Sequence, residues 1–273
     1  RDVPVAGVKN LRELVECLKN PEPYLKREIQ EEIPSIINTD MGMDFSDIEG
    51  QEGAKRAAEI AVSGFHNLLL IGPPGTGKTM LARRLPTIMP GLGFEEKLEL
   101  TRIYSIAGLL SREHPLIDER PFRSPHHTST PQAIAGGGRN PRPGEITLAH
   151  KGVLFLDEMP EFSRASLELL RQPMEDKVIQ IARASGTYNF PADFMLCAAM
   201  NPCPCGYYPD LNRCTCTAGE IIHYMGKISR PLLDRIDIST EVPPVSFSQL
   251  HCGRKGENSA AIRKRVEKVQ KIQ

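Results

Sequence analysis

The chain has 273 residues, which is enough for one large α/β domain or for one domain with a small appendage. Lysine and arginine together number 34, as do aspartate and glutamate, so the formal net charge is zero. This balance excludes a surface that is basic all over, and it restricts any contact with nucleic acid to a local loop or pore. Tryptophan is absent and aromatic residues make up 5% of the chain, which argues against a large base-stacking platform.

The two ends of the chain suggest that it is part of something longer. It begins Arg1-Asp2-Val3-Pro4, with neither an initiator methionine nor a signal peptide. We therefore expect an excised fragment. Apolar residues at helical spacing predict a short helix over residues 11–19, and residues 20–43 have the prolines and charges of a linker. Residues 1–43 are thus expected to be the end of a truncated upstream domain.

Short apolar runs alternate with helical periods over residues 44–245. Buried strands are predicted at 67–71, 153–157, 194–200 and 236–239. Helices are predicted at 51–63, 78–88, 95–107 and 163–175, and a further helix at 259–271. Ser185-Gly186 lies between two strand-like runs and predicts a β-hairpin over 178–191. The alternation predicts a parallel sheet with helices on both faces, and residues 111–145 are expected to form functional loops. We find no run of about 18 apolar residues, so no transmembrane helix is predicted.

The most specific motif follows the first predicted strand. It consists of Gly72, Pro73, Pro74, Gly75, Thr76, Gly77, Lys78 and Thr79. This is the P-loop pattern, and it has the preceding strand and following helix that the pattern requires. Backbone N–H groups of such a loop wrap phosphates, the lysine reaches the β- and γ-phosphates, and the threonine hydroxyl binds Mg²⁺. An ordinary glycine-rich turn is the weaker interpretation.

Asp157 and Glu158 end the second buried strand. In an open α/β sheet, ligands bind beyond the carboxyl ends of the strands. Asp157 there could hold Mg²⁺ through water, and Glu158 could act as the general base for an attacking water. Two acids that merely cap a helix are the alternative, and the P-loop in the same chain makes that alternative less favoured.

Together these motifs resemble those of a known class. Gly72–Thr79, the segment 154–158 and Asn201 resemble the Walker A, Walker B and sensor 1 elements of AAA+ ATPases. The segments 122–129 and 136–150 are similar to the magnesium chelatase-like AAA+ proteins, specifically the competence protein ComM-like (YifB-like) branch. The resemblance covers about residues 44–240, and the long loop motifs make it specific.

The resemblance implies a fold and several residue roles. The fold would be an AAA+ core over residues 44–245 with β-hairpin insertions, followed at 246–273 by the start of a mostly missing helical lid. Asn201 would sense the γ-phosphate, and Ile48 and Gly50 would lie near the adenine. Arg235 would be the arginine finger that reaches a neighbouring subunit, with Arg230 as a rival. A salt bridge from Arg235 to Asp234 or Asp237 is the non-functional alternative.

The resemblance also implies an activity. A cytoplasmic ring, expected to be a hexamer, would hydrolyse ATP with Mg²⁺ and drive branch migration or unwinding of DNA in recombination or natural transformation. The hairpin would line its pore, with Arg183, Arg139 and Arg142 as candidate DNA contacts, although solvated arginines are equally expected. A magnesium chelatase-type or protein-remodelling subunit is one alternative, and a nucleotide-gated scaffold without DNA is another. Glu158 argues against the scaffold, which needs no general base.

Four cysteines gather within fourteen residues as two Cys-x-Cys pairs: Cys203, Cys205, Cys214 and Cys216. Four thiolates suit a closed, structural zinc site in a loop over residues 203–216, and four reduced, unligated thiols are the open alternative. Such a loop would border the active site, because it follows Asn201 directly. The adjacent His126 and His127 are poorly placed to bind one metal together, since neighbouring side chains of a strand point to opposite faces. They are expected to make loop hydrogen bonds or to contact a substrate in the pore.

Overall fold

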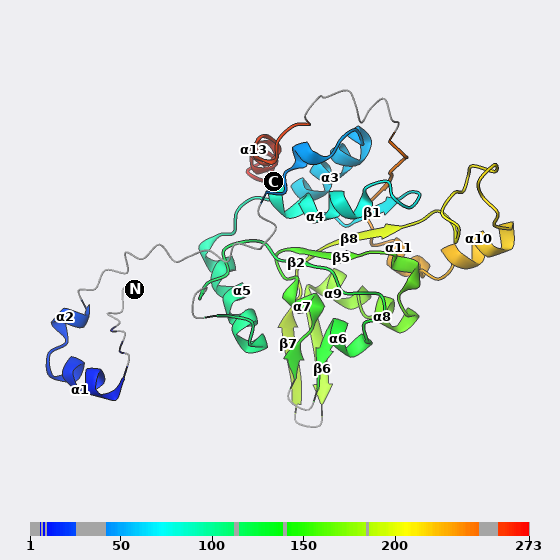
Figure 1. The fold of residues 1–273 in the computed structure, drawn as a ribbon. Helices are drawn as coiled ribbons and strands as arrows, with labels where there is room; N and C mark the ends of the chain where they lie inside the picture. Colours follow the sequence, from blue (N-terminus) through cyan, green and yellow to red (C-terminus); the bar gives the residue numbers. More distant parts are fainter. Residues whose placement is uncertain are drawn as a thin grey trace. The chain divides into compact units, whose positions relative to one another are not determined.

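The computed structural model describes residues 6, 8, 10–25, 42–111, 115–138, 141–183, 186–245 and 256–272 (Figure 1). The chain divides into two compact units, residues 1–34 and 35–273. The first unit contains α1 (Leu11–Lys19), as predicted, and α2 (Glu22–Leu25). Asn10 caps α1, since its side chain accepts a hydrogen bond from the backbone N–H of Glu13 at 2.9 Å.

A parallel sheet of five strands forms the centre of the second unit. Its order is β2 (Phe122–Arg123), β5 (Val153–Leu156), β8 (Met195–Met200), β1 (Leu68–Ile71) and β9 (Ile238–Glu241). All neighbouring pairs run parallel. The α/β expectation is therefore confirmed. The edge strand β2 was not predicted, because two residues are too few to show a period, and β9 begins two residues later than expected.

Helices cover both faces of this sheet (Figure 1). On one face, α3 (Glu52–Gly64), α4 (Lys78–Ile88) and α13 (Ser259–Gln270) pack over side chains such as Leu68 and Leu70. The other face buries Leu69 against the helices that follow β2 and β5. The alternation of adjacent leucines between the two cores is the period of two of a strand that is buried on both faces.

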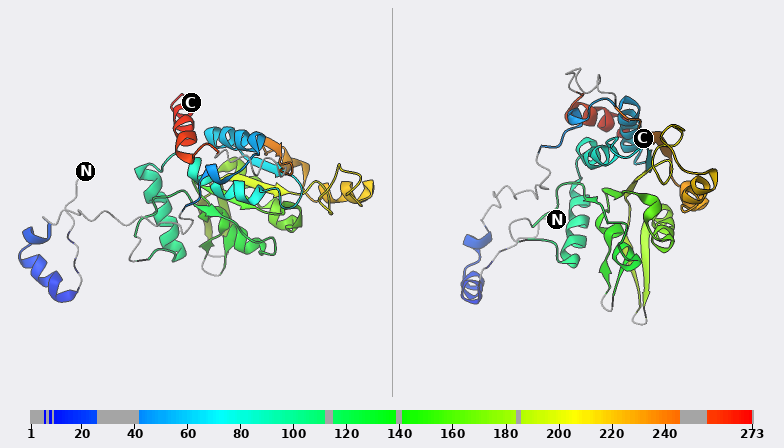
Figure 2. Two further views of the ribbon diagram at one scale, coloured as in Figure 1. Left: turned by 45° about the horizontal axis from the view of Figure 1, so that its top comes forward. Right: turned by 45° about the vertical axis from the view of Figure 1, so that its right-hand side comes forward.

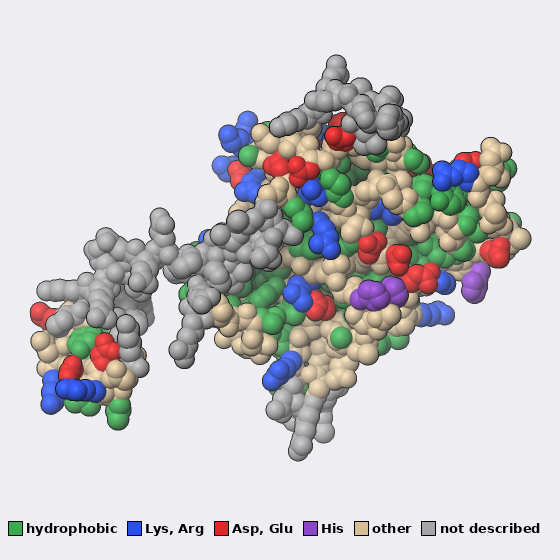
Figure 3. All heavy atoms as spheres, viewed as in Figure 1, with side chains coloured by type: hydrophobic (Ala, Val, Ile, Leu, Met, Phe, Trp, Pro, Cys, Tyr) green, Lys and Arg blue, Asp and Glu red, His purple; other side chains and the backbone are tan. Residues whose placement is uncertain are grey.

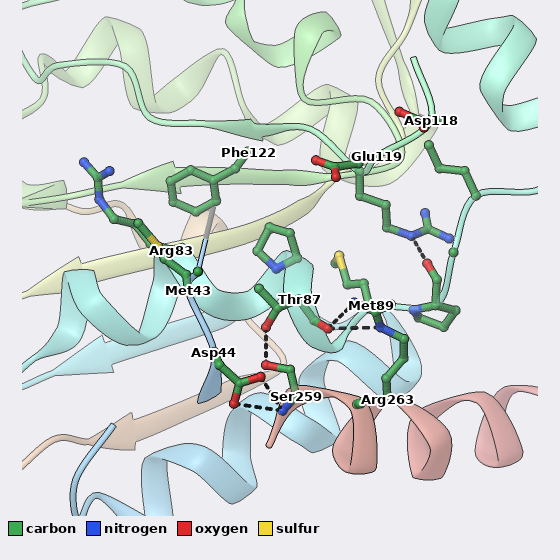
Figure 4. Close-up of a pocket in the computed structure, with 17 residues that line it drawn as sticks. Met43, Asp44, Arg83, Thr87, Met89, Asp118, Glu119, Phe122, Ser259 and Arg263 are labelled. Carbon is green, nitrogen blue, oxygen red and sulfur yellow. Dashed lines mark hydrogen bonds between the residues drawn. The ribbon is translucent and has the colours of Figure 1, made fainter. Parts of the chain in front are cut away.

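A network of polar contacts attaches α13 to α4. The Thr87 and Ser259 hydroxyl oxygens lie 2.7 Å apart, Asp44 accepts from the Ser259 N–H, and Arg263 donates to the Thr87 carbonyl (Figure 4). These residues line a cavity of about 610 Å³ that also reaches Arg120. None of the residues predicted for the active site lines this cavity.

The helix predicted over residues 163–175 is divided into α8 (Arg164–Glu168) and α9 (Arg171–Asp176). Pro173 explains the break, because it has no N–H to donate and its ring would clash with the carbonyl four residues earlier, that of Leu169. Ser163 caps α8 as expected, accepting from the Ser166 N–H at 3.1 Å.

The expected loops at 111–145 contain short elements, and the predicted hairpin is present. The elements of this region are α6 (Pro131–Ala135), β3 (Gly136–Gly137), β4 (Arg142–Pro143) and α7 (Glu145–Leu148). The hairpin strands β6 (Val178–Arg183) and β7 (Gly186–Pro191) extend away from the sheet (Figure 2). A Cβ on Gly136 would lie 3.3 Å from Ile181 Cδ1, so the β3–β4 ribbon packs closely against the hairpin.

The remaining elements are η1 (Phe45–Asp47), α5 (Phe94–Ala107), η2 (Met159–Glu161), α10 (Ala218–Met225) and α11 (Arg230–Leu233). Helix α5 was predicted from the sequence, whereas α10 and α11 were not. Within the described part of the chain, no helix is long and apolar enough to cross a membrane.

Candidate active site

The P-loop connects β1 to α4 at the carboxyl edge of the sheet. Gly75 and Gly77 have φ values of +77° and +90°, a left-handed conformation that favours glycine. Gly72 is required for another reason, since a Cβ there would lie 2.2 Å from the Val242 carbonyl oxygen on the neighbouring strand end. The glycines of the motif thus bend the loop and let it lie directly against the sheet.

Lys78 is buried at the first turn of α4, with 8% of the residue exposed. Its Nζ donates to the carbonyls of Gly72 and Pro73 at 2.7 and 2.8 Å, and to Asn201 Oδ1 at 3.2 Å. Burial lowers the pKa of Lys78, while the charges of Asp157 and Glu158 oppose this shift. A partly desolvated ammonium group therefore lies beside Asn201, with two carboxylates near it.

Thr79 and Asp157 meet although they lie 78 positions apart in the chain. Thr79 Oγ1 donates to Asp157 Oδ2 at 2.8 Å. A hydroxyl and a carboxylate side by side are the hard oxygen donors that suit Mg²⁺. The donor set therefore fits the metal that the motif implies.

Glu158 follows directly and has a positive φ of 52°, while its N–H donates to Asp157 Oδ1 at 3.0 Å. Its side chain is 60% exposed. A non-glycine residue held in this conformation marks local strain, which is concentrated at functional sites. Glu158 lines a cavity of about 420 Å³ with Pro74, Gly75, Thr76, Gly77, Lys78, Thr79, Met80, Asp157, Met200 and Asn201. The structure thus brings the P-loop, both acids and Asn201 together.

The two histidines differ in their surroundings. His126 Nδ1 lies 2.8 Å from Thr128 Oγ1, which is one of the two expected environments, a loop hydrogen bond. His127 Nδ1 instead lies 3.6 Å from Glu158 Oε2, and its ring contacts Phe162 edge-on at 6.5 Å between centroids. The approach of His127 to Glu158 was not predicted from the sequence.

A second cavity, of about 440 Å³, lies on the other side of the P-loop. Ile48, which was expected to lie near the adenine, lines this cavity, whereas Gly50 is absent from its lining. A Cβ on Gly50 would lie 3.4 Å from a methyl group of Val245, which does line the cavity. The lining also includes Gln51, Tyr207 and Arg213, which were not among the predicted site residues. Gln51 Nε2 donates to the Thr76 carbonyl at 3.2 Å and so holds the P-loop from this side.

Arg235 is bonded within its own chain. It donates to the carbonyl of Pro231 and to the carboxylate of Glu175. The expected alternative, a salt bridge to Asp234 or Asp237, is therefore wrong in its choice of partner. Asp237 instead accepts from the backbone N–H of Asn67 at 2.7 Å. The rival Arg230 is exposed at the start of α11.

The four cysteine sulfurs of residues 203–216 form one cluster, with all four Sγ atoms within 4.8 Å of one another. The Sγ atom of Cys203 lies 3.3 Å from that of Cys205 and 3.8 Å from that of Cys214. Tetrahedral zinc with bonds of about 2.3 Å requires sulfurs about 3.8 Å apart. The backbone N–H of Tyr207 lowers the pKa of Cys205 to about 6, so one thiolate forms readily in the cluster. Desolvation and the neighbouring Cys205 and Cys203 raise the pKa of Cys214 and of Cys216, because a second thiolate beside the first is costly.

The candidate DNA contacts are only partly described. Arg142 is exposed in β4, beside the hairpin. Arg183 ends β6, but its side chain lies outside the described residues, as does the whole of Arg139. Charges of both signs are mixed over the face in Figure 3, as the zero net charge leads one to expect.

A P-loop between strand and helix, with a threonine–aspartate pair beneath it in a five-stranded parallel sheet, defines an α/β P-loop NTPase of the AAA+ class. The family model described as "Magnesium chelatase, subunit ChlI" matches residues 44–250, and the chain belongs to this family. The resemblance inferred from the motifs is therefore confirmed. AAA+ ATPases of this kind use a nucleotide with Mg²⁺ and typically assemble into rings.

Several curated proteins are similar to this chain. YifB of Salmonella typhimurium is 47% identical over 89% of the chain and 47% of its own length. Competence protein ComM of Haemophilus influenzae is 45% identical over 97% of the chain and 52% of its own length. Lon protease 2 of Bacillus subtilis is 28% identical over 50% of the chain and 26% of its own length. The chain spans about half the length of YifB and ComM.

Proposed function

We propose that this protein binds Mg²⁺–ATP between the P-loop and Asp157 and hydrolyses it. The observation that supports this most strongly is the 2.8 Å contact of Thr79 with Asp157, beside Lys78 and at the edge of the cavity that Glu158 also lines. This cavity combines a P-loop, a hydroxyl–carboxylate pair and a separate, exposed carboxylate.

Each residue has a separate task in this proposal. Lys78 binds the β- and γ-phosphates, and Thr79 and Asp157 hold Mg²⁺, which neutralises phosphate charge when bound. Glu158 accepts the proton of the attacking water, and its exposed side chain is free to reach that water. Asn201, which already bonds to Lys78, senses the γ-phosphate and orients the water. Ile48 and Gly50 lie near the adenine base of the nucleotide.

The arginine finger is supplied by a neighbouring copy in a ring, proposed to be a hexamer. Arg235 is our first choice, because among the described residues its guanidinium group pairs with a single carboxylate, that of Glu175. It must leave Glu175 to reach the next ATP. Arg230 needs no such release, since it is exposed. In other NTPases such a finger is worth about a thousandfold or more in rate.

We further propose that Cys203, Cys205, Cys214 and Cys216 bind a structural Zn²⁺. The compact sulfur cluster supports this. The cluster stabilises a loop with little core of its own, since only Cys203 and Gly206 are buried among residues 203–216. Four reduced, unligated thiols are the alternative to zinc. We also propose a cytoplasmic location for the protein, because ATP is available there and thiols stay reduced.

DNA is the proposed substrate, moved by branch migration or unwinding in recombination or natural transformation. The protruding β6–β7 hairpin, with Arg183 on β6 and Arg142 on the adjoining ribbon, offers a local cationic contact of the kind that phosphates need. The name of the Haemophilus relative, a competence protein, supports the same substrate. A chelatase-type or protein-remodelling subunit is the second candidate, favoured by the family description. A scaffold without turnover is disfavoured by Glu158.

The decisive experiment measures ATP hydrolysis by the full-length parent protein with branched, single-stranded and duplex DNA. Stimulation by branched or single-stranded DNA supports the DNA motor. Basal turnover without stimulation by any DNA moves the proposal to a remodelling or chelatase-type subunit. Glu158→Gln should retain ATP binding and lose turnover, and undiminished hydrolysis in this variant would remove Glu158 from the role of general base.

A further inference from the structure

The cysteine loop, residues 203–216, lies against the P-loop. Gly206 has a φ of +87°, and a Cβ there would lie 2.6 Å from Cδ of Pro74 and 3.8 Å from Cγ of Asn201. The loop can approach this closely only because residue 206 is a glycine. Interactions that fix the position of the cysteine loop therefore also restrain one side of the P-loop.

Two side chains of the cysteine loop reach the second cavity. Tyr207 and Arg213 both line it, and the guanidinium carbon of Arg213 lies 4.0 Å from the centroid of the Tyr207 ring. This distance is that of a stacked cation–π pair. Among the described residues, the Arg213 side chain has no ion-pair partner. The Arg213 guanidinium plane and the Tyr207 ring are therefore available to contact a ligand in the cavity.

The chemistry of the cavity suits a flat, mostly apolar group joined to a phosphate chain. Ile48, Met80 and Val245 supply apolar surface, and the P-loop supplies the phosphate-binding end. A guanidinium plane stacks on aromatic faces, and a tyrosine ring does the same with any base. A purine base satisfies both requirements at once.

We propose that the Tyr207–Arg213 stack is the wall against which the purine base of the nucleotide packs, and that metal binding by the four cysteines keeps this wall in place. The inference rests on the proposed nucleotide binding and adds the base-side contact to it. The chain path connects the two parts, since Tyr207 follows Cys205 by two residues and Arg213 precedes Cys214. The N–H groups of Arg213 and Cys214 both donate to the Asp210 carbonyl, at 3.1 and 2.7 Å, which closes the turn between them.

The first test compares two probes by calorimetry, ADP and inorganic tripolyphosphate, each with Mg²⁺. Tyr207→Ala and Arg213→Ala should weaken ADP binding by about tenfold, the value of one base-stacking contact. Tripolyphosphate binding should stay the same, because it has no base. Asn212→Ala, an exposed residue of the same loop, is the matched control.

The outcomes separate this inference from the proposed function. Unchanged ADP affinity in both variants overturns the stack, and so does an equal loss of tripolyphosphate affinity, which would mean contact with phosphates. Arg213→Lys keeps the charge but not the plane, so full ADP affinity in this variant also overturns stacking. If the unmodified chain binds neither probe, the proposed nucleotide site itself fails.

A second test addresses the metal. Chelation of Zn²⁺ in the folded protein should weaken ADP binding by about the same factor as Tyr207→Ala and add little to that variant. Cys214→Ser should reproduce the effect of chelation. Full ADP affinity in zinc-depleted protein whose circular dichroism is unchanged would overturn the role of the metal, while the comparison of Tyr207 and Arg213 variants tests the stack independently.

Discussion

His127 Nδ1 lies 3.6 Å from Oε2 of Glu158, the proposed general base. The imidazole is itself held, because its ring lies 4.1 Å from that of His126 and meets Phe162 edge-on. Glu158 is 60% exposed, so little else restrains its carboxylate. The loop after β2 therefore supplies a side chain that can position the base supplied by β5.

Replacing His127 by alanine should slow hydrolysis by between about tenfold and a hundredfold, because a misplaced reacting group costs that much. Nucleotide affinity should not change, since His127 is not among the residues that line the cavity. Steady-state turnover and calorimetric affinity check the two parts. His126→Ala is the matched control, and an equal loss of turnover in that variant would mean that the loop as a whole, rather than the His127–Glu158 contact, is responsible.

Replacing Lys78 by alanine should weaken ATP binding by about a hundredfold, because the variant loses charge-assisted hydrogen bonds to two phosphates. The fold should survive, since burial lowers the pKa of Lys78 and the charged form is costly to bury there. Lys268→Ala on the exposed side of α13 is the control. Retained affinity in the Lys78 variant would overturn the P-loop assignment.

The two finger candidates are separable in an assembled ring. Arg235→Ala should reduce hydrolysis by about a thousandfold and leave the affinity of the single chain for nucleotide unchanged. Arg230→Ala should have little effect. Activity of the Arg235 variant equal to that of the unmodified ring would transfer the role to Arg230. Glu175→Gln is informative as well, because it releases Arg235 from its partner and should not reduce turnover.

The parts of this site that local sequence determines were predictable. The conformation of the P-loop is determined by glycines within its own eight residues. Asp157 directly follows a run of apolar residues that identifies a buried strand. The pairing of two Cys-x-Cys segments was also accessible, because only eight residues separate them.

Contacts that depend on the path of a loop were not predictable. His127 reaches Glu158, and Tyr207 reaches the second cavity, only because of how residues 124–130 and 203–216 cross the edge of the sheet. Gly206 was the one available signal, since a glycine two residues from Pro204 allows a close approach. The break at Leu169 was indicated by Pro173, but helical periodicity across residues 163–175 concealed it.

Freshly purified, metal-replete protein should contain one zinc per chain. Cys205→Ser and Cys214→Ser should each lose the metal and lower thermal stability, because a closed Cys₄ site contributes folding free energy directly. Cys197→Ser is the control for metal content, since that thiol is buried in β8 away from the cluster. Elemental analysis measures the metal, and a zinc-free protein would establish the alternative of four unligated thiols.

Stability should fall as the pH falls below about 6.5, and His150 should account for part of the loss. Burial lowers the pKa of His150; its Nδ1 accepts from the Asp193 N–H at 3.0 Å. Glu99 Oε2 lies 3.1 Å from His150 Nε2, without the alignment of a hydrogen bond. The Glu99 carboxylate raises the pKa of His150, but it only partly offsets the lowering caused by burial.

The sign follows from proton counting. Below the unfolded pKa of about 6.5 and above the lowered folded pKa, the unfolded chain binds more protons at this histidine than the folded chain does. The free energy of unfolding should therefore drop by up to about 1.4 kcal/mol per pH unit in that window and level off below it. His150→Asn retains an acceptor for the Asp193 N–H and cannot titrate. Urea unfolding followed by circular dichroism at pH 7.5 and 5.5 should show a smaller drop for this variant, and equal drops would assign the pH dependence to other groups.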